Sequence, residues 1–462
     1  MTHNFDKDFT WGVASSAYQI EGGAQEGGRG PSIWDAFDHI PGKILNGDNA
    51  SVACDHFNRW QEDIDLMVDM NIDAYRFSIS WSRIMPQGYG EINEEGVEFY
   101  NNLIDGLLAK GIQPWVTLFH WDLPLALQFE KDGLLNPSIS DDFVNYARVC
   151  FERFGDRVKH WISLNEPWCS AMLGHGLGVK APGRVSLTEP YIVGHNLLIA
   201  HAKTVELYRR EFKAEQQGLI GITNNCDWRE PASKHTKDIE AAERALEFFI
   251  GWFADPVYLG DYPKSMRDRL GERLPSFTAE EKHLLLNSSD FFGLNHYSTL
   301  IASNGDGMGH IENTIKGNGG ISDDQNVLLS SRDEWAKTDM GWNIVPWGCQ
   351  SLLEWIHKRY NGPNIYITEN GCALDGEDDI DVAIDDQRRI NYLRSYIDKC
   401  EAAIKNGVKL KGYFAWSLMD NFEWEEGYSR RFGLHYVDYT TGERTAKRSS
   451  QWYSEKIIQS KR

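Results

Sequence analysis

The run Pro114-Trp-Val-Thr-Leu-Phe119 is almost wholly apolar and leads directly into His120-Trp-Asp122. Such a run is typical of a β-strand that is covered on both faces. Similar short runs recur along the chain, and each leads into a longer amphipathic stretch. The sequence therefore predicts strands at Thr10–Ala14, Ala74–Ser78, Pro114–Phe119, Trp161–Asn165, Leu219–Thr223, Phe291–Asn295, Asn364–Thr368 and Lys411–Trp416.

The stretches between these runs have helical patterns. The segment from residue 54 to residue 70, for example, places Phe57, Trp60 and Ile64 at helical spacing. Asp-Asp pairs at 141–142 and 385–386 favour helix N-termini, and Gly111 is typical of a helix stop. We expect helices at Cys54–Met70, Val97–Ala109, Asp141–Phe154, Tyr191–Phe212, Ile239–Trp252, Trp347–Arg359 and Gln387–Lys405.

Eight strands that alternate with helices predict an α/β fold, a (β/α)8 TIM barrel. No Pro- or Ser-rich linker divides the chain, so we expect one domain over residues 1–462, with extended loops at the C-terminal face of the strands. The Gly-rich stretch Gly305–Gly320 is expected to be an exposed loop over the barrel mouth, and it lacks the strand–turn–helix setting of a phosphate cradle. The alternative, an open doubly wound sheet, needs a Gly-rich turn after the first strand, which Trp11-Gly-Val-Ala-Ser-Ser16 does not supply.

Composition and charge narrow the class of partner. The chain has 462 residues and a formal net charge of −21, which repels phosphate backbones and anionic lipid and argues against nucleic acid or a membrane as a partner. No apolar segment approaches the roughly 18 residues of a membrane span, and the first eight residues lack the apolar core of a signal peptide. The seven cysteines are scattered without a C-x-x-C pair, which disfavours zinc and disulfides and favours a reduced, cytoplasmic location.

Polar and aromatic residues gather where the predicted strands end. In a TIM barrel the carboxyl ends of the strands surround the active site. Taken singly, each of these residues is more often a cap, an ion-pair partner or a core residue; taken together they indicate an active site. They are Arg76, His120–Asp122, Asn165–Pro167, Asn295–Tyr297, Glu369–Gly371, Trp416 and Glu423–Trp424.

Two carboxylates, Glu166 and Glu369, follow the fourth and the seventh strands. A barrel with strands ~4.8 Å apart has a radius of roughly 8 Å, which places these two Cα atoms roughly 14 Å apart. Glutamate side chains that reach inward by ~4–5 Å leave about 5 Å between the carboxyl groups. This separation is typical of retaining glycosidases, whereas inverting enzymes keep a wider gap.

Four motifs resemble those of glycoside hydrolase family 1 β-glucosidases. They are Phe9–Gly23, Ser163-Leu-Asn-Glu-Pro167, Tyr366-Ile-Thr-Glu-Asn-Gly371 and Trp416–Trp424, and they follow in order on the predicted strands. The second motif begins more often with threonine in that family, and Ser163 keeps a hydroxyl at this position. The resemblance extends over nearly the whole chain.

The resemblance implies a retaining β-glucosidase that needs no metal or organic cofactor. It implies that Glu369 is the nucleophile that forms a covalent glycosyl-enzyme, and that Glu166 is the general acid and then the general base. The supporting residues that it implies are Arg76 and Tyr297 as donors to the nucleophile, Asn165 at the sugar 2-OH, and Asn295 beside the catalytic pair.

The resemblance also implies a sugar site. His120 and Trp416, taken alone, would more often be core residues, but together with the other residues that the resemblance implies they favour a sugar site. Trp121 is interpreted as packing support. The implied substrate-binding residues are Gln19, His120, Glu423 and Trp424, with Trp416 as the stacking floor, and the implied aglycone-side residues are Trp168, Leu173 and Trp342.

Two positions narrow the expected substrate. Relatives that hydrolyse 6-phosphosugars typically have a small or hydroxyl residue where Glu423 stands, and a carboxylate repels a dianionic phosphate. Thioglucosidase relatives have glutamine where Glu166 stands. We therefore expect hydrolysis of unphosphorylated terminal β-D-glucosyl residues, as in cellobiose, short oligosaccharides and aryl β-glucosides, with side activity on β-galactosides or β-fucosides. Such a reaction belongs to carbohydrate metabolism and cellulose degradation.

Two other classes of protein remain as alternatives. A sugar-binding protein without activity is disfavoured by the presence of both carboxylates, and it would bind a chromogenic glucoside without releasing product. A barrel enzyme that depends on a metal or a Schiff base is disfavoured because the sequence has no H-E-x-x-H motif or clustered His/Asp set. Turnover that is unaltered by a chelator would rule out an enzyme that depends on a metal ion.

Overall fold

Eight parallel strands close a barrel in the computed structural model, which describes residues 5–306 and 322–461. Around the barrel the order is β1-β2-β3-β4-β5-β7-β10-β11, and β11 pairs again with β1. The predicted TIM barrel is confirmed, and every predicted strand lies within two residues of its observed bounds. These are β1 (Thr10–Ala14), β2 (Ala74–Ser78), β3 (Gln113–Phe119), β4 (His160–Asn165), β5 (Leu219–Asn225), β7 (Phe292–Asn295), β10 (Ile365–Asn370) and β11 (Leu410–Trp416).

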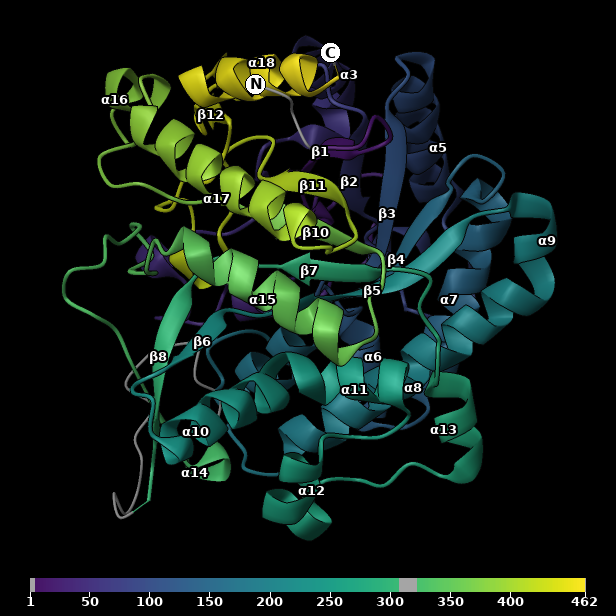
Figure 1. Cartoon of the computed structure of the whole chain (residues 1–462). Coiled ribbons are helices and arrows are strands. Elements are labelled where there is room, and N and C mark those ends of the chain that lie inside the picture. The colour runs from purple at the N-terminus through teal and green to yellow at the C-terminus, as the bar shows by residue number, and fades with distance from the viewer. Residues whose placement is uncertain (1–4, 307–321, 462) are drawn as a thin grey trace.

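Helices cover the outside of the barrel (Figure 1). Asp141 and Asp142 lie in the first turn of α7, and Asp386 is the residue before α17, as the Asp-Asp pairs predict. The long helices are α3 (His56–Asp69), α5 (Glu94–Ala109), α7 (Ile139–Phe154), α8 (Glu189–Leu207), α10 (Thr236–Leu246), α15 (Pro346–Arg359), α17 (Gln387–Lys405) and α18 (Arg448–Ser460).

Two of the predicted helices are interrupted by π-helical turns. The helix expected at Tyr191–Phe212 is α8 followed by a π turn at Tyr208–Phe212. The helix expected at Ile239–Trp252 is α10, a π turn at Glu247–Gly251 and the start of α11 (Trp252–Leu259). A single π turn inserts one residue and leaves the apolar pattern almost helical, so periodicity alone does not reveal it.

Strand β3 shows how alternating side chains build two cores. Val116 and Leu118 lie in the core between the barrel and the helices. Trp115 points into the barrel, where its ring packs against Tyr366 and Phe414 at centroid distances of 4.8 Å and 5.0 Å. This aromatic layer gives the polar strand ends an apolar floor, since Trp115 lies near the start of its strand.

Short strands that the sequence did not predict lie in the connections after the barrel strands. β6 (Trp228–Pro231), β8 (Thr299–Asn304) and β9 (Val327–Ser330) form a three-stranded sheet, and β12 (His435–Val437) pairs with β13 (Arg444–Ala446). β6 and β8 directly follow β5 and β7, so this small sheet extends the C-terminal ends of the barrel. The Gly-rich loop predicted at 305–320 falls almost wholly outside the described residues.

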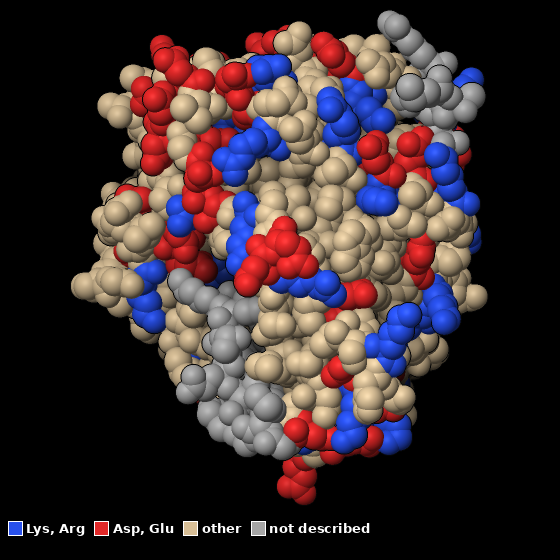
Figure 2. All heavy atoms as spheres, turned by 60° about the vertical axis from the view of Figure 1, so that its left-hand side comes forward, with Lys and Arg blue, Asp and Glu red and all other residues tan. Residues whose placement is uncertain are grey.

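The surface carries both signs of charge. Acidic and basic side chains are interspersed over the face shown in Figure 2. Within residues 5–306 and 322–461, none of the helices combines the length and the apolar character that a membrane span requires.

Candidate active site

A cavity of about 180 Å³ lies where the barrel strands end, and Glu166 and Glu369 both line it. Most of the residues that the sequence singles out meet here. Those on the cavity wall are His120, Glu166, Leu173, Asn295, Tyr297, Trp342, Glu369, Trp416, Glu423 and Trp424. Four others are buried and are not among the residues that line the cavity: Gln19, Arg76, Asn165 and Trp168.

Glu369, near the end of β10, is bound by one cation and one hydroxyl. Its Oε1 pairs with the guanidinium of Arg76, which is wholly buried. Its Oε2 accepts a hydrogen bond of 2.7 Å from the hydroxyl of Tyr297. A cation and a hydroxyl donor both favour the ionised form of a carboxylate. The contacts expected for Arg76 and Tyr297 are therefore present.

Glu166, just after β4, has neutral partners. Asn295 Nδ2 donates to its Oε1 at 2.7 Å, and the thiol of Cys169 donates to its Oε2 at 3.2 Å. Burial, and then the charge of Glu369, raise the pKa of Glu166 to about 7. At neutral pH this carboxyl can therefore both hold and release a proton.

One hydrogen-bonded chain connects the two glutamates. Arg76 binds Glu369 and also donates from Nη2 to Asn165 Oδ1 at 2.6 Å. Asn295 Nδ2 donates to the same Oδ1 at 3.0 Å and to Glu166. The positions of the two carboxyl groups are thus coupled through side chains from four strands. Their predicted separation of about 5 Å stays a prediction.

Three cavity residues have left-handed backbone conformations. The φ angles are +46° at Glu166, +76° at Trp121 and +51° at Trp424. Such a conformation costs a non-glycine residue on the order of 1–3 kcal/mol, and it persists only where the surrounding structure determines it. Strain of this kind gathers at functional sites, and here it lies at three points of one cavity.

The far end of the cavity is built by His120, Glu423 and the Trp416 and Trp424 rings. The His120 ring stacks on both indoles, at 6.0 Å and 5.9 Å between centroids. Asn165 Nδ2 donates to His120 Nε2 at 3.1 Å, so the other ring nitrogen carries the proton and has no hydrogen-bond partner among the described residues. Burial, with Arg76 nearby, lowers the pKa of His120 well below its usual value, so the ring is neutral.

Gln19 is hydrogen-bonded to the chain at this end of the cavity. Its Nε2 donates to Asn421 Oδ1 at 3.0 Å, to the Phe422 carbonyl at 2.9 Å and to Glu423 Oε2 at 3.4 Å. Burial raises the pKa of Glu423 to about 8. Glu423 is therefore mainly protonated at neutral pH. A neutral carboxyl repels a sugar 6-phosphate less than the carboxylate expected from the sequence at this position.

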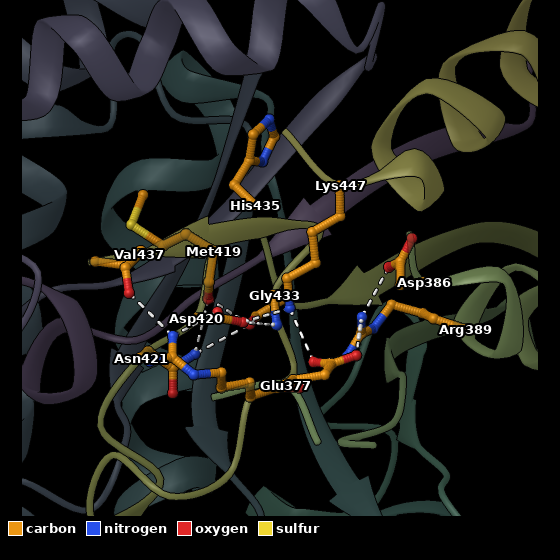
Figure 3. A network of polar contacts seen from close by, with 12 residues as sticks. Glu377, Asp386, Arg389, Met419, Asp420, Asn421, Gly433, His435, Val437 and Lys447 are labelled. Carbon is orange, nitrogen blue, oxygen red and sulfur yellow. Dashed lines mark hydrogen bonds and ion pairs between the residues drawn. The ribbon is translucent and has the colours of Figure 1, made fainter. Parts of the chain in front are cut away.

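Buried charged side chains surround Asp420, which lies in the loop after β11, and Figure 3 labels Glu377, Asp386, Arg389 and Lys447 among them. Asp420 accepts hydrogen bonds of 2.9 Å from both Lys447 Nζ and Arg431 Nη1, and a third from the Gly433 N–H. Lys447 Nζ also lies 3.0 Å from a carboxylate oxygen of Glu377. This ion pair connects the contacts of Asp420 with those of Arg389. We name the following residues the buried ion network: Glu377, Asp386, Arg389, Asp420, Arg431 and Lys447.

Several residues that contact the site were not predicted from the sequence. Lys180 lines the cavity, lies over the rings of Trp121 and Trp424, and donates to Glu425 Oε2 at 2.5 Å. Trp121, predicted as packing support, also lines the cavity. The only available sequence signal for Cys169 was its position three residues after Glu166, and Lys180 lies in a loop outside every motif.

Of the residues expected on the aglycone side, Leu173 and Trp342 line the cavity, and Trp342 packs on Tyr297 at 5.2 Å between ring centroids. Trp168 is set back from the cavity and packs on Phe249, which is itself part of the wall. Among the described residues, no group of three or more His, Cys, Asp and Glu side chains is placed to hold a metal ion.

Known proteins share this chain's sequence and fold. Residues 1–462 match the family model for glycosyl hydrolase family 1. The chain is 51% identical to Beta-glucosidase 42 of Arabidopsis thaliana, over 98% of this chain and 94% of that protein. It is similar to a rice β-glucosidase mutant solved in a covalent complex with Glc, with a TM-score of 0.93, 46% identity and 98% of each chain covered. A family 1 β-glucosidase from Thermotoga maritima gives a TM-score of 0.92 and 45% identity, over 100% of this chain and 99% of that one.

Proposed function

The chain belongs to glycosyl hydrolase family 1 and is a retaining β-glucosidase, and we propose that Glu369 is its nucleophile and Glu166 its acid/base. One observation carries this assignment. Two glutamates face one cavity, and one of them is bound by a guanidinium while the other has only neutral hydrogen-bond partners. The first environment suits a carboxylate that attacks, and the second suits a carboxyl that exchanges a proton.

In the first step Glu369 attacks the anomeric carbon of the sugar while the glycosidic C–O bond breaks. The leaving oxygen takes the proton of Glu166, so the aglycone departs as a neutral alcohol or phenol. Arg76 and Tyr297 hold the attacking carboxylate in place. Asn165 is proposed to bind the sugar 2-OH, a contact that strengthens in the transition state.

In the second step a water molecule attacks the anomeric carbon of the glycosyl-enzyme. Esterification removes the charge of Glu369, and that charge is one of the causes that raise the pKa of Glu166. Glu166 then takes a proton from the water, and the released Glu369 regains its charge. The anomeric configuration is inverted twice and is therefore retained.

The sugar is proposed to lie at the far end of the cavity. Gln19, His120 and Glu423 supply polar groups for its hydroxyls, and the ring of Trp416 covers its apolar face. The aglycone then lies toward Leu173 and Trp342. We propose cellobiose, short oligosaccharides and aryl β-glucosides as substrates, with slower turnover of β-galactosides and β-fucosides.

We further propose that residues 1–462 act as one catalytic domain in the cytoplasm. Residues that line the cavity come from both halves of the chain, from His120 to Phe432. All seven cysteines are unpaired and buried, which suits a reducing compartment.

Two variants test the assignment of the glutamates. Glu369→Gly should lower the hydrolysis of p-nitrophenyl β-glucoside by at least about 10⁴-fold, because the covalent step has no nucleophile. With added azide, this variant should form the α-glucosyl azide, whereas Glu166→Ala should form the β-glucosyl azide. Glu98→Gln, on the exposed face of α5, is the matched control and should retain activity. Full activity of Glu369→Gly would contradict the proposal.

A further inference from the structure

The hydrogen-bond donors around Glu166 have only one possible arrangement. An arginine only donates, so Asn165 must present Oδ1 to Arg76 Nη2. The same Oδ1 also accepts from Asn295, so Asn295 must present its Nδ2 to Asn165. The amide oxygen of Asn295 is consistent with this orientation, since Oδ1 accepts a hydrogen bond of 2.7 Å from the Thr368 hydroxyl.

This arrangement determines which oxygen of Glu166 can carry its proton. Asn295 Nδ2 lies 2.7 Å from Oε1 and is a donor that cannot accept. A proton on Oε1 directed at Asn295 would leave two donors facing each other, which loses the hydrogen bond. The acid proton therefore belongs on Oε2.

The partner of Oε2 is the thiol of Cys169, at 3.2 Å. Cys169 is the first residue of the π-helical segment Cys169–Gly176 and lines the cavity. Asn225, at the end of β5, donates from Nδ2 to the same sulfur at 3.3 Å. A thiol is both a weak donor and a weak acceptor, so it can serve either protonation state of the carboxyl.

We propose that Cys169 is a positioning residue for the acid/base: its thiol donates a hydrogen bond to Oε2 of ionised Glu166 and accepts one from the Oε2 hydroxyl of neutral Glu166, while Asn225 donates a hydrogen bond to the sulfur. The proton that reaches the leaving group is then always delivered from Oε2. This inference rests on the proposed role of Glu166 and adds the residue that orients its proton.

The direction in which Cys169 shifts the pKa of Glu166 follows from the relative strength of its hydrogen bonds to the ionised and to the neutral carboxyl. A hydrogen bond donated to a carboxylate is stronger than one that a neutral carboxyl donates to sulfur, so the thiol favours the ionised form. Its bond acts to lower the pKa of Glu166 against the larger effect of burial. Other titratable and charged groups near Glu166 and Cys169, which a change at Cys169 leaves in place, are Arg76, Lys180, Tyr297, Glu369 and Glu423.

The test is the pH dependence of kcat/KM for p-nitrophenyl β-glucoside. Cys169→Val fills the space without a donor, and Cys169→Ala is the smaller variant if valine disturbs folding. In both variants, the alkaline limb of the pH profile of kcat/KM should shift to higher pH by about half a unit. The acid limb of the profile should stay in place. Cys169→Ser keeps a donor and acceptor and should restore the wild-type limb or lower it slightly. Asn225→Ala should give a smaller upward shift.

Controls separate this effect from general damage. Cys150→Ala removes a buried thiol in α7, away from the cavity, and should leave both limbs unchanged. A dinitrophenyl β-glucoside, whose leaving group needs no proton, should show no shift of the alkaline limb in any variant. If Cys169→Val and Cys169→Ala both keep the wild-type alkaline limb with p-nitrophenyl β-glucoside, the role of Cys169 is wrong. The role of Glu166 is tested separately by the products that Glu166→Ala forms with azide.

Discussion

The two walls of the cavity hold their glutamates with different kinds of partner. On the wall formed by β10 and β11, Glu369 binds the guanidinium of Arg76, and the loop after β11 rests on the buried ion network. On the wall formed by β4, β5 and β7, Glu166 accepts hydrogen bonds from an amide and a thiol. A carboxyl that gains and loses a proton in each cycle needs neutral partners, because a fixed cation would hold it ionised.

The largest expected effect comes from removing the cation of the first wall. Arg76→Leu should lower kcat/KM for p-nitrophenyl β-glucoside by about 10³-fold, because Glu369 then lies buried without a compensating charge. Tyr297→Phe removes a neutral donor from the same carboxylate and should cost about 10-fold to about 100-fold. Equal losses of kcat/KM in the two variants would show that the positive charge of Arg76 contributes no more to the function of Glu369 than a neutral donor does.

The buried ion network should contribute to stability and to sugar binding. Asp420→Asn leaves the buried ion network with one uncompensated positive charge, because Lys447 keeps Glu377 as a partner while Arg431 loses its buried carboxylate, and it should lower the free energy of unfolding by about 3–5 kcal/mol. Combining it with Lys447→Met removes one positive charge and should recover part of the loss. The variants can be compared by their urea midpoints and by KM, which should rise more than kcat falls.

An exposed ion pair is the matched control for the network. Asp375 and Arg388 pair at the surface, with exposed side-chain fractions of 71% and 58%. Asp375→Asn should change the free energy of unfolding by less than about 1 kcal/mol and leave KM unchanged. A loss as large as that of Asp420→Asn would mean that burial does not set the strength of these pairs.

The pH dependence of the unmodified enzyme tests the neutral partners of Glu166 without any substitution. Burial and Glu369 raise the pKa of Glu166 to about 7, so the acid form is present below this pH and is lost above it. The value of kcat/KM for p-nitrophenyl β-glucoside should therefore fall about tenfold per pH unit on the alkaline side. A dinitrophenyl β-glucoside should lose much less, since its leaving group departs without the proton. Parallel losses for both substrates would contradict the assignment of the alkaline limb to Glu166.

Local pattern was enough to predict the elements but not all of their irregularities. The apolar run at β3 and the helical spacing over α3 are visible within a dozen residues, and both elements lie within two residues of the predicted bounds. The π turns and the short strands β6, β8 and β9 were not predicted. A π turn barely disturbs the apolar period, and these strands pair with one another across long stretches of chain.

The barrel, the family, and the glutamates, aromatic residues and polar groups at the strand ends could all be predicted from the amino-acid pattern. The hydrogen-bond and ion-pair partners of those groups depend on the folded chain. Asn295 lies 129 residues from Glu166 along the chain, and Arg76 lies 293 residues from Glu369. Closure of the barrel brings such pairs within hydrogen-bond distance, and no local pattern records that closure. The thiol beside Glu166 and the buried ion network at the loop after β11 are therefore visible only in three dimensions.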